Sequence, residues 1–578
     1  MPRFRLVCLP IIYLALAACQ APEPVSEPAP EPAPPSGVSA SPSPGMVAAA
    51  HPLAVEAGLD ILRAGGSAVD AAVAVQAALG LVEPQSSGLG GGGFLLVHDP
   101  ASGETTVYDG RETAPASADE TLFLDADGEP LRYFDGIVSG RSTGVPGAVA
   151  ALAAAHADHG KLPWAETLAP VLPLAEDGFT VTARMSSMLE RMQGFGSPLD
   201  ADPLAGPLWY PEGAPVAAGT SLVNSAYGES LRALQANPRA LLEGPLAEAI
   251  VARVGEPPRP GGLTLADLAA YEVVERAPVC TSYRGLSVCS APPPASGGVF
   301  LAQALGILET VDMGALGPTP AGWHRFIEAS RLAYADRDAY VGAPEAMERS
   351  LAELTDADYL ARRAAEIDPD RAIPAAAPGL GPCPDRTPDR EGTSHFAVVD
   401  ADGLALAMTT TVEGPFGSQR MVGGFVLNNQ LTDFGFRPVV DGCAHPNRPG
   451  PGKRPRSSMS PTLVFDADGG FLFSTGSPGG NSIPAYTLKT LVGMIDWGLS
   501  PQDAADLPNV VARGDTVRVE KDAMDPATLE ALRALGHEID DGRGEISGIH
   551  IIARDPDGTL TGAADARREG VARSAAAE

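Results

Sequence analysis

The order of secondary-structure signals along the chain is the feature that most limits its possible folds. Between about residues 145 and 380 the sequence is rich in alanine and leucine with helical spacing, as in VPGAVAALAAAHADHG. From Thr393 onward, short β-forming runs alternate with turn signals: TSHFAVVD, ADG and LALAMTTT, then TLVFD, ADGG and FLFSTG. These runs predict two β-hairpins, and a helix follows at about 483–497. Helical layers around antiparallel strands indicate an α+β sandwich.

The N-terminal part of the folded region predicts two helices and a glycine-rich strand. Residues 53–64 have helical spacing, and Ser67 with Asp70 forms a capping-box start to a second, almost entirely apolar helix that we expect to be buried. The run SGLGGGGFLLVHD at 87–99 contains the glycines of a phosphate-binding loop. However, no Gly-Lys-Ser/Thr follows, and the glycines lead into a strand at 94–98. We therefore interpret them as sites of tight backbone packing.

The charge of the chain restricts the class of ligand. The 578 residues include 72 acidic and 40 basic side chains, which gives a formal net charge of −32. This balance makes contact with nucleic acid or with anionic lipid headgroups electrostatically unfavourable. The 44% hydrophobic content is that of a globular protein, and a small soluble substrate fits it better than a nucleic acid.

The N-terminus predicts export. Residues 1–19 begin with two arginines and continue with an apolar stretch shorter than the ~20 residues that a membrane span needs. The stretch ends in Leu-Ala-Ala-Cys, which resembles the lipobox of bacterial lipoproteins and would make Cys19 a lipid-modified N-terminus. We favour such a periplasmic or cell-envelope lipoprotein over simple secretion. Residues 20–45 are rich in proline and carry only negative charge, which predicts a stiff, extended tether.

Four cysteines remain beyond the predicted signal peptide, namely Cys280, Cys289, Cys383 and Cys443. In an exported protein and an oxidising setting, we expect them to form disulfides. Three pairings of the four are possible, and we favour Cys280 with Cys289.

The dipeptide Gly392-Thr393 opens the first predicted hairpin and offers a chemical possibility. A threonine hydroxyl becomes a good nucleophile when a base takes its proton, and its own α-amino group is such a base once the chain is cut before it. That amine has a pKa of ~7.7 to 8.0 in model peptides, so a useful fraction is neutral at physiological pH. A preceding glycine permits the close backbone approach that such a cut requires. Alone, a Gly-Thr pair usually marks only a turn entering a strand.

Several further motifs support the nucleophile interpretation. The sequence from Thr393, TSHFAVVDADGLALAMTTTVEGPFG, resembles the signature of gamma-glutamyltransferases, a family of N-terminal nucleophile hydrolases. Other segments that resemble the family follow in order: LNNQLTDF at 427–434, GKRPRSSMSPT at 452–462 and GSPGGN at 476–481. Upstream, YDGRETAP at 108–115 and the glycine-rich run are also similar to it. The resemblance covers nearly everything from Met46 to the C-terminus.

The resemblance implies catalytic roles for specific residues. Thr393 would be the nucleophile and its freed amine the base. Thr411 would support that nucleophile from the other strand of the predicted hairpin. Gly479 and Gly480 correspond to the pair whose backbone N–H groups hold an oxyanion, and their place just before a predicted helix suits this role.

The resemblance also implies a binding site for the α-carboxylate of a γ-glutamyl group. Arg111, Ser457 and Ser458 match the residues that bind it. A guanidinium suits this role because it can hold a carboxylate with two hydrogen bonds. The segment 435–456 is expected to form a shortened lid.

The α-amino group of the same substrate needs the opposite kind of partner. The positions that hold this ammonium in the family are matched by Glu413, Gln430 and Asp433. Glu413 departs from the commoner asparagine, and Thr432 replaces a frequent acidic residue. The two changes together are expected to leave a net negative subsite.

Three other motifs have simpler explanations. We interpret His395, in the nucleophile strand, as a packing residue. His156 and His159 have metal-ligand spacing, but they lie at a predicted helix end where histidines favour the dipole, and no third ligand cluster is evident, so we expect no metal. Residues 140–144 fit the G-x-S-x-G pattern of a serine hydrolase with Ser142 as nucleophile. Little parallel-sheet pattern precedes them and no oxyanion loop stands out, so this alternative is weaker.

The family resemblance implies a four-layer αββα sandwich of the N-terminal nucleophile hydrolase type, made as a precursor. Self-cleavage between Gly392 and Thr393 would give a large subunit, residues 46–392, and a small subunit, residues 393–578. The enzyme would cleave the γ-glutamyl amide of glutathione or a related compound through an ester on Thr393, without a cofactor, and pass the group to water, an amino acid or a peptide. Two alternatives remain. One is a cephalosporin or glutaryl amide acylase on the same fold, against which Arg111 and Asp433 argue, and the other is a binding lipoprotein that never matures.

Overall fold

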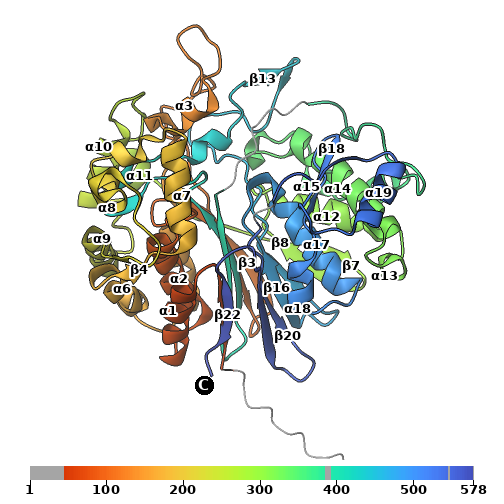
Figure 1. Cartoon of the computed structure of the whole chain (residues 1–578), viewed down its shortest axis with the longest axis horizontal. Coiled ribbons are helices and arrows are strands. Elements are labelled where there is room, and N and C mark those ends of the chain that lie inside the picture. Colours follow the sequence, from red (N-terminus) through yellow and green to blue (C-terminus); the bar gives the residue numbers. More distant parts are fainter. Residues whose placement is uncertain (1–43, 384–391, 545–546, 577–578) are drawn as a thin grey trace, which may run out of the picture. The chain divides into compact units, whose positions relative to one another are not determined.

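Two antiparallel β-sheets packed face to face lie at the centre of a computed structural model that describes residues 44–383, 392–544 and 547–576 (Figure 1). The strand order of the first sheet is β22 (Val571–Ser574), β1 (Met46–Ala49), β9 (Ser394–Val399), β10 (Ala405–Thr411), β2 (Gly92–Asp99), β3 (Glu104–Gly110) and β6 (Val274–Arg276). The order of the second is β21 (Leu560–Ala564), β20 (His550–Arg554), β16 (Phe471–Gly476), β15 (Thr462–Phe465), β8 (Leu286–Ser290) and β7 (Val279–Tyr283).

The alternation of side chains along the strands explains why both faces of each sheet are covered. In β9, Ala397 and Val399 face the second sheet and join the apolar layer between the two sheets. Phe396 and Val398 point the other way, into the core that the first sheet forms with its helices. A strand that is apolar on both faces is stable only between two covering layers.

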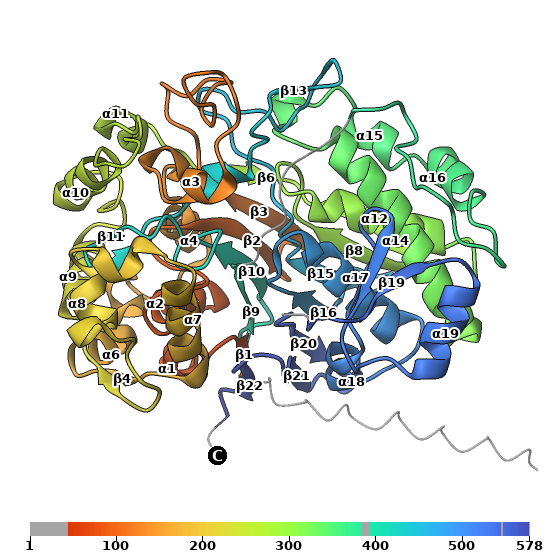
Figure 2. The same ribbon diagram turned by 45° about the horizontal axis from the view of Figure 1, so that its top comes forward.

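A helical layer covers the outer face of each sheet (Figures 1 and 2). The first sheet is covered by α1 (Pro52–Arg63), α2 (Ala68–Val82) and α4 (Ala148–His159). The second sheet is covered by α12 (Gly297–Leu308) and α17 (Ile483–Ile495), with α14 (Pro320–Tyr340) packed on α12. The predicted four-layer αββα sandwich is thus confirmed.

Local sequence signals account for many element boundaries. Ser67 and Asp70 form the predicted capping box at the start of α2, and every residue of that helix is buried. The two predicted hairpins are β9–β10 and β15–β16. In the first hairpin, Ser394 lies opposite Thr410, so the next residues outward, Thr393 and Thr411, are neighbours.

The predicted N-terminal features fall largely outside the described residues. The signal peptide, Cys19 and the tether up to residue 43 belong to this part of the chain. Within the described ranges, no helix combines the length and the apolar character that crossing a membrane requires.

The four remaining cysteines form two disulfides. Cys280 pairs with Cys289 across β7 and β8, which confirms the favoured pairing. Cys383 pairs with Cys443, which lies in β14 (Cys443–Ala444) of a small hairpin with β13 (Val439–Val440). This hairpin belongs to the segment expected to form a lid. The second disulfide therefore connects the chain on the two sides of the expected cleavage point.

We expect this disulfide to keep the two subunits covalently joined after cleavage between Gly392 and Thr393, because Cys383 and Cys443 would then lie on different fragments. The cleaved protein should run as one species on a non-reducing denaturing gel and as two on a reducing gel. Cys443→Ser should give two species on both gels. The double variant Cys280→Ser/Cys289→Ser, which removes the disulfide within one fragment, should behave like the wild type. Cleaved wild-type protein that separates without reductant would disprove the link.

Candidate active site

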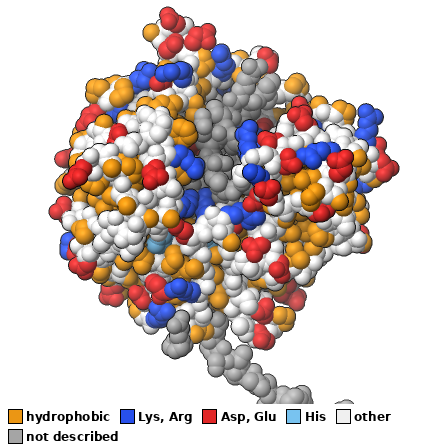
Figure 3. Space-filling model, in the orientation of Figure 1, with side chains coloured by type: hydrophobic (Ala, Val, Ile, Leu, Met, Phe, Trp, Pro, Cys, Tyr) orange, Lys and Arg blue, Asp and Glu red, His pale blue; other side chains and the backbone are white. Residues whose placement is uncertain are grey.

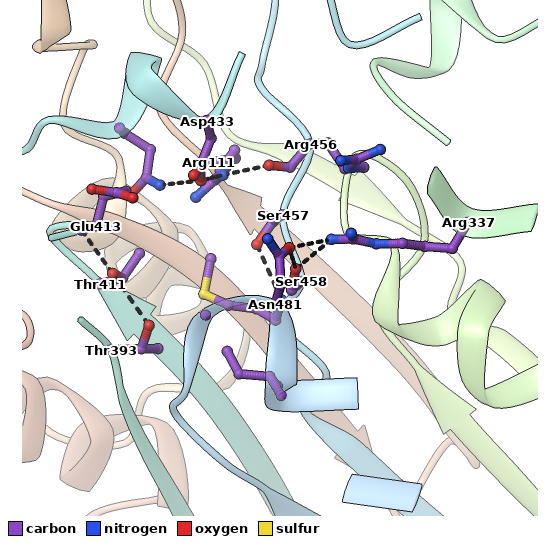
Figure 4. Close-up of a pocket in the computed structure, with 14 residues that line it drawn as sticks. Arg111, Arg337, Thr393, Thr411, Glu413, Asp433, Arg456, Ser457, Ser458 and Asn481 are labelled. Atoms are coloured by element: carbon purple, nitrogen blue, oxygen red, sulfur yellow. Dashed lines mark hydrogen bonds and ion pairs between the residues drawn. The ribbon is translucent and has the colours of Figure 1, made fainter. Parts of the chain in front are cut away.

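One pocket at the end of the two sheets collects most of the predicted site residues (Figure 4). They come from distant parts of the chain: Arg111 follows β3, Thr411 ends β10, and Ser457 and Ser458 precede β15. The predicted residues that line the pocket are Arg111, Thr393, Thr411, Glu413, Gln430, Asp433, Ser457, Ser458 and Gly480. Gly479 directly precedes Gly480 but does not line the pocket itself.

A chain of hydroxyl contacts surrounds the predicted scissile bond. The Thr393 side chain, in a residue that is 5% exposed, donates to the Thr411 hydroxyl oxygen over 3.5 Å. The Thr411 hydroxyl in turn donates to the carbonyl oxygen of Gly392 and accepts from the backbone N–H of Glu413 over 2.8 Å. A hydrogen bond to that carbonyl draws electron density from its carbon, which is the atom that a nucleophile attacks. The predicted support of Thr393 by Thr411 has a direct geometric counterpart.

Two glycines make this contact sterically possible. A Cβ atom at Gly392 would lie 2.0 Å from the carbonyl oxygen of Glu413. A Cβ atom at Gly91, in the glycine-rich run, would lie 2.1 Å from the carbonyl oxygen of Thr411. Any side chain at either position would displace the segment that holds Thr411. Tight backbone packing, predicted for the glycine-rich run, is confirmed.

Buried charges behind Thr393 hold its backbone and were not identified from the sequence. Arg568 donates from Nη1 to the carbonyl oxygen of Thr393 over 2.8 Å. Burial lowers the pKa of Arg568 to about 9, and Glu83 stands 3.7 Å from its guanidinium. The other oxygen of Glu83 accepts from the Ser394 hydroxyl over 2.6 Å. The residues on both sides of the Thr393 carbonyl are thus fixed by side chains from distant segments.

Opposite charges meet at the far end of the pocket. Arg111, which is 1% exposed, forms an ion pair with Asp433 at 2.5 Å, and Gln430 donates to the same carboxylate oxygen over 2.7 Å. The guanidinium of Arg111 also donates to the carbonyl oxygens of Pro455 and Arg456, over 3.1 and 2.8 Å. These two carbonyls hold the Arg111 guanidinium independently of Asp433. A cation and an anion side by side suit a ligand that carries both charges.

Glu413 is a buried carboxyl group among the residues predicted to bind the ammonium group. Burial, followed by the nearby charge of Asp433, raises the pKa of Glu413 to about 8, although Asn429 and Tyr133 donate hydrogen bonds to its carboxyl group. Both causes disfavour a negative charge on Glu413 itself. The net negative charge expected for the subsite as a whole stays a prediction. An ammonium group bound nearby would favour the ionised form.

The turn after β16 contains the two predicted oxyanion glycines, both in the positive-φ region of the backbone. Gly479 and Gly480 have φ angles of 134° and 57°, and the turn leads directly into α17. A Cβ atom at Gly479 would also lie 2.5 Å from the ring of Tyr486. Glycine is therefore needed here for the course of the backbone next to the pocket.

Arg337 is a further pocket residue that the sequence did not reveal (Figure 4). It lies in α14 and is 1% exposed. Its guanidinium donates to the Ser458 hydroxyl and, over 2.8 Å, to the side-chain oxygen of Asn481. The Ser458 hydroxyl also donates to Asn481 over 2.7 Å. Arg337 thus joins the serine pair to the turn that contains Gly480.

Comparison with known proteins agrees with this geometry. The family model described as gamma-glutamyltranspeptidase matches residues 54–575. The chain belongs to the gamma-glutamyltranspeptidase family. It is 39% identical over 542 residues to the glutathione hydrolase proenzyme of Escherichia coli (strain K12), with 90% of each chain covered. It is 35% identical over 543 residues to the acylase ACY 1 proenzyme of Pseudomonas sp. (strain SE83), covering 92% of this chain and 93% of the relative.

The fold of this family member is similar to that of a solved acylase structure. The crystal structure of cephalosporin acylase from Bacillus halodurans superposes with a TM-score of 0.80 at 29% identity, covering 95% of this chain and 98% of that one. The sequence-based resemblance and the predicted N-terminal nucleophile hydrolase fold are therefore confirmed.

The other motifs noted in the sequence have structural roles in this member of the gamma-glutamyltranspeptidase family. The buried Ser142 hydroxyl donates to the carbonyl oxygens of Ile137 and Ser139, so it is not presented as a nucleophile. His395 is buried, shares a hydrogen bond with Thr409 and packs against His550, as expected of a packing residue.

Two clusters of histidine and carboxylate side chains have an arrangement that resembles a metal site. At the end of α4, His156 pairs with Asp70 at 3.2 Å and approaches the Leu162 carbonyl oxygen. Elsewhere, His324, Glu328 and His537 place three ligand atoms within 4.8 Å of one another. However, the facing nitrogens of His324 and His537 are 2.7 Å apart, whereas two nitrogens on one tetrahedral zinc lie about 3.3 Å apart at normal Zn–N distances. We interpret the second group as a buried hydrogen-bond network.

The contact between Thr411 and Gly392 predicts that Thr411→Val slows self-cleavage. The variant loses the hydroxyl that polarises the Gly392 carbonyl, and loss of such a donor typically slows a reaction by about 10² to 10³. Thr411→Ser should cleave at a rate close to that of the wild type. Thr410→Val, at the adjacent position of the same strand, serves as the control for packing damage. The measurement is the uncut fraction on reducing gels over time, and rapid cleavage of Thr411→Val would argue against the assigned contact.

Proposed function

We propose that the protein is an exported precursor that cuts itself between Gly392 and Thr393 and then hydrolyses or transfers γ-glutamyl groups. The observation that carries this proposal is the hydroxyl pair of Thr393 and Thr411 beside the Gly392 carbonyl, in one pocket with Arg111 and Asp433. Membership of the gamma-glutamyltranspeptidase family and the names of the proenzyme relatives support it. The folded part of the large subunit would be residues 46–392, joined through the tether 20–45 to a lipid-modified Cys19, and the small subunit would be residues 393–578.

Self-cleavage can be written with the groups in place. The Thr393 oxygen attacks the Gly392 carbonyl carbon, whose oxygen already accepts from Thr411. The proton of the Thr393 hydroxyl passes to the departing Thr393 nitrogen and the peptide C–N bond breaks. Gly392 is left as an ester on the Thr393 oxygen. Water hydrolyses that ester. The products are a carboxylate at Gly392 and a free α-amine on Thr393, which is the base needed for later turnovers.

Turnover repeats this chemistry on a γ-glutamyl amide. The Thr393 amine takes the hydroxyl proton, the oxygen attacks the γ-carbonyl carbon, and the negative charge on the carbonyl oxygen develops near Gly479 and Gly480. The proton then passes to the departing amine as the amide bond breaks, which leaves a γ-glutamyl ester on Thr393. Attack on this ester by water gives hydrolysis, and attack by an amine gives transfer.

The remaining pocket residues would orient the γ-glutamyl group. Its α-carboxylate would bind Arg111, Ser457 and Ser458, with Ser458 held by Arg337. Its ammonium would bind a second set, namely Asp433, Gln430 and Glu413. The retained acidic groups at 413 and 433 favour this substrate over the glutaryl amide of an acylase, which lacks the α-amino group. No step requires a cofactor.

The proposal predicts strong selection for the α-amino group. We expect kcat/KM for γ-glutamyl-4-nitroanilide to exceed that for glutaryl-4-nitroanilide by at least about tenfold, because hydrogen bonds to charged groups contribute about 1.5–3 kcal/mol. Asp433→Asn should reduce this preference. Thr393→Ala should remain uncut and inactive.

The outcomes separate the three functions. Equal or faster turnover of the glutaryl compound would favour an acylase. A purified protein that stays uncut and turns over neither compound would favour the non-maturing binding lipoprotein.

A further inference from the structure

A wide cleft adjoins the γ-glutamyl pocket. Its lining includes Gly392 and residues of α7 (Ala183–Gly194) and β18 (Thr516–Val519). Figure 1 labels both elements. Two side chains that line the cleft form hydrogen bonds with residues of the γ-glutamyl pocket. Tyr133 lines the cleft and donates to Glu413 in the pocket, and Arg568 lines the cleft and donates to the Thr393 carbonyl. Gly392, the residue directly before Thr393, lines the cleft as well, so the cleft reaches the reactive threonine.

The cleft has the opposite charge balance to the rest of the chain. Its lining contains seven arginines and three carboxylates, whereas the whole chain has 40 basic and 72 acidic residues. Glu83, Glu520 and Asp565 also pair with arginines of the lining from behind it. With these three carboxylates included, the count is seven arginines and six carboxylates, so the cleft still carries no excess of negative charge. Figure 3 shows several Lys and Arg side chains near the centre of this face.

Two of these arginines stand apart from the buried ion pairs. Arg191, on the exposed side of α7, makes no ion pair with any residue in the described ranges. On the other side, the side chain of Arg543 is 73% exposed, and its one ion pair within the described part of the chain is a surface contact with Asp540 at 3.2 Å. An exposed pair of this kind contributes little to stability, so neither guanidinium is needed to hold a wall of the cleft. Both remain available to a ligand.

We propose that this arginine cleft binds the part of the substrate beyond the scissile amide and selects compounds in which that part carries carboxylates. The ligand class is thus an acidic γ-glutamyl peptide. A guanidinium suits this ligand because it forms two parallel hydrogen bonds with a carboxylate. A positive cleft in an otherwise acidic protein also concentrates anions at the reactive threonine. This inference rests on the proposed γ-glutamyl activity.

The test compares two nearly isosteric donors that differ in one charge. In γ-glutamyl-glutamate the side chain of the leaving residue ends in a carboxylate. In γ-glutamyl-glutamine that side chain ends in an uncharged amide of nearly the same shape, and both leaving residues keep their α-carboxylate. We expect the mature enzyme to have the higher kcat/KM for the glutamate compound. The ratio of the two values should fall about threefold to tenfold in the double variant Arg191→Gln/Arg543→Gln, since each exposed charge interaction is of the order of 1 kcal/mol or less.

Salt and a control variant sharpen the result. Raising the ionic strength should lower kcat/KM for γ-glutamyl-glutamate more than for γ-glutamyl-glutamine, because exposed charges are screened. Arg63→Gln removes an exposed arginine of α1 that does not line the cleft, and it should leave the ratio unchanged. Because each variant is measured with both donors, a general loss of folded enzyme cancels in the ratio.

The outcomes distinguish this inference from the function on which it rests. Turnover of both donors with the same ratio in the wild type and the double variant would overturn the arginine cleft as a carboxylate site, and it would leave the γ-glutamyl activity intact. If the wild-type enzyme hydrolyses neither donor, the proposed function itself is wrong, and the assignment of the cleft falls with it.

Discussion

The pairing of β9 with β10 is the constraint on which the active site depends. Its register sets Ser394 opposite Thr410, and this places the Thr393 and Thr411 side chains together at the end of the hairpin. The sandwich protects that register, because each strand of the hairpin is apolar on both faces and is packed between a helical layer and the second sheet. A shift of one residue would exchange the two faces and separate the two hydroxyls. The β9–β10 register is thus required both for the packing of the sandwich and for the contact between the two hydroxyls.

The charged side chains of the pocket determine which kind of ligand it can bind. Arg111 and Asp433 form an ion pair, and the carbonyl oxygens of Pro455 and Arg456 also accept hydrogen bonds from Arg111. A ligand with one carboxylate and one ammonium can therefore replace each partner without leaving a buried charge unpaired, which otherwise costs about 3–5 kcal/mol. Glu413 adds a second buried carboxyl group beside Asp433, and burial raises its pKa to about 8. The pocket is thus suited to a zwitterionic end group.

The sequence predicted what depends on local pattern and on motifs. The hairpins, the capping box of α2 and the pairing of Cys280 with Cys289 follow from short-range signals, and the family motifs carried the predicted pocket residues. Arg337 and Arg568 were missed because a single arginine in a helix or loop resembles any surface charge until the fold buries it. The charge of the arginine cleft was hidden for a related reason: its arginines are scattered through an acidic sequence and meet only in the folded chain.

The most direct test of the mechanism is mass spectrometry of the reduced enzyme, quenched during turnover of a slow γ-glutamyl donor. We expect a small subunit whose first residue is Thr393, with a fraction of it heavier by one γ-glutamyl group. Peptide mapping should place that group on the Thr393 side-chain oxygen. An active enzyme whose chain is intact between Gly392 and Thr393, or whose adduct lies on another residue, would contradict the mechanism.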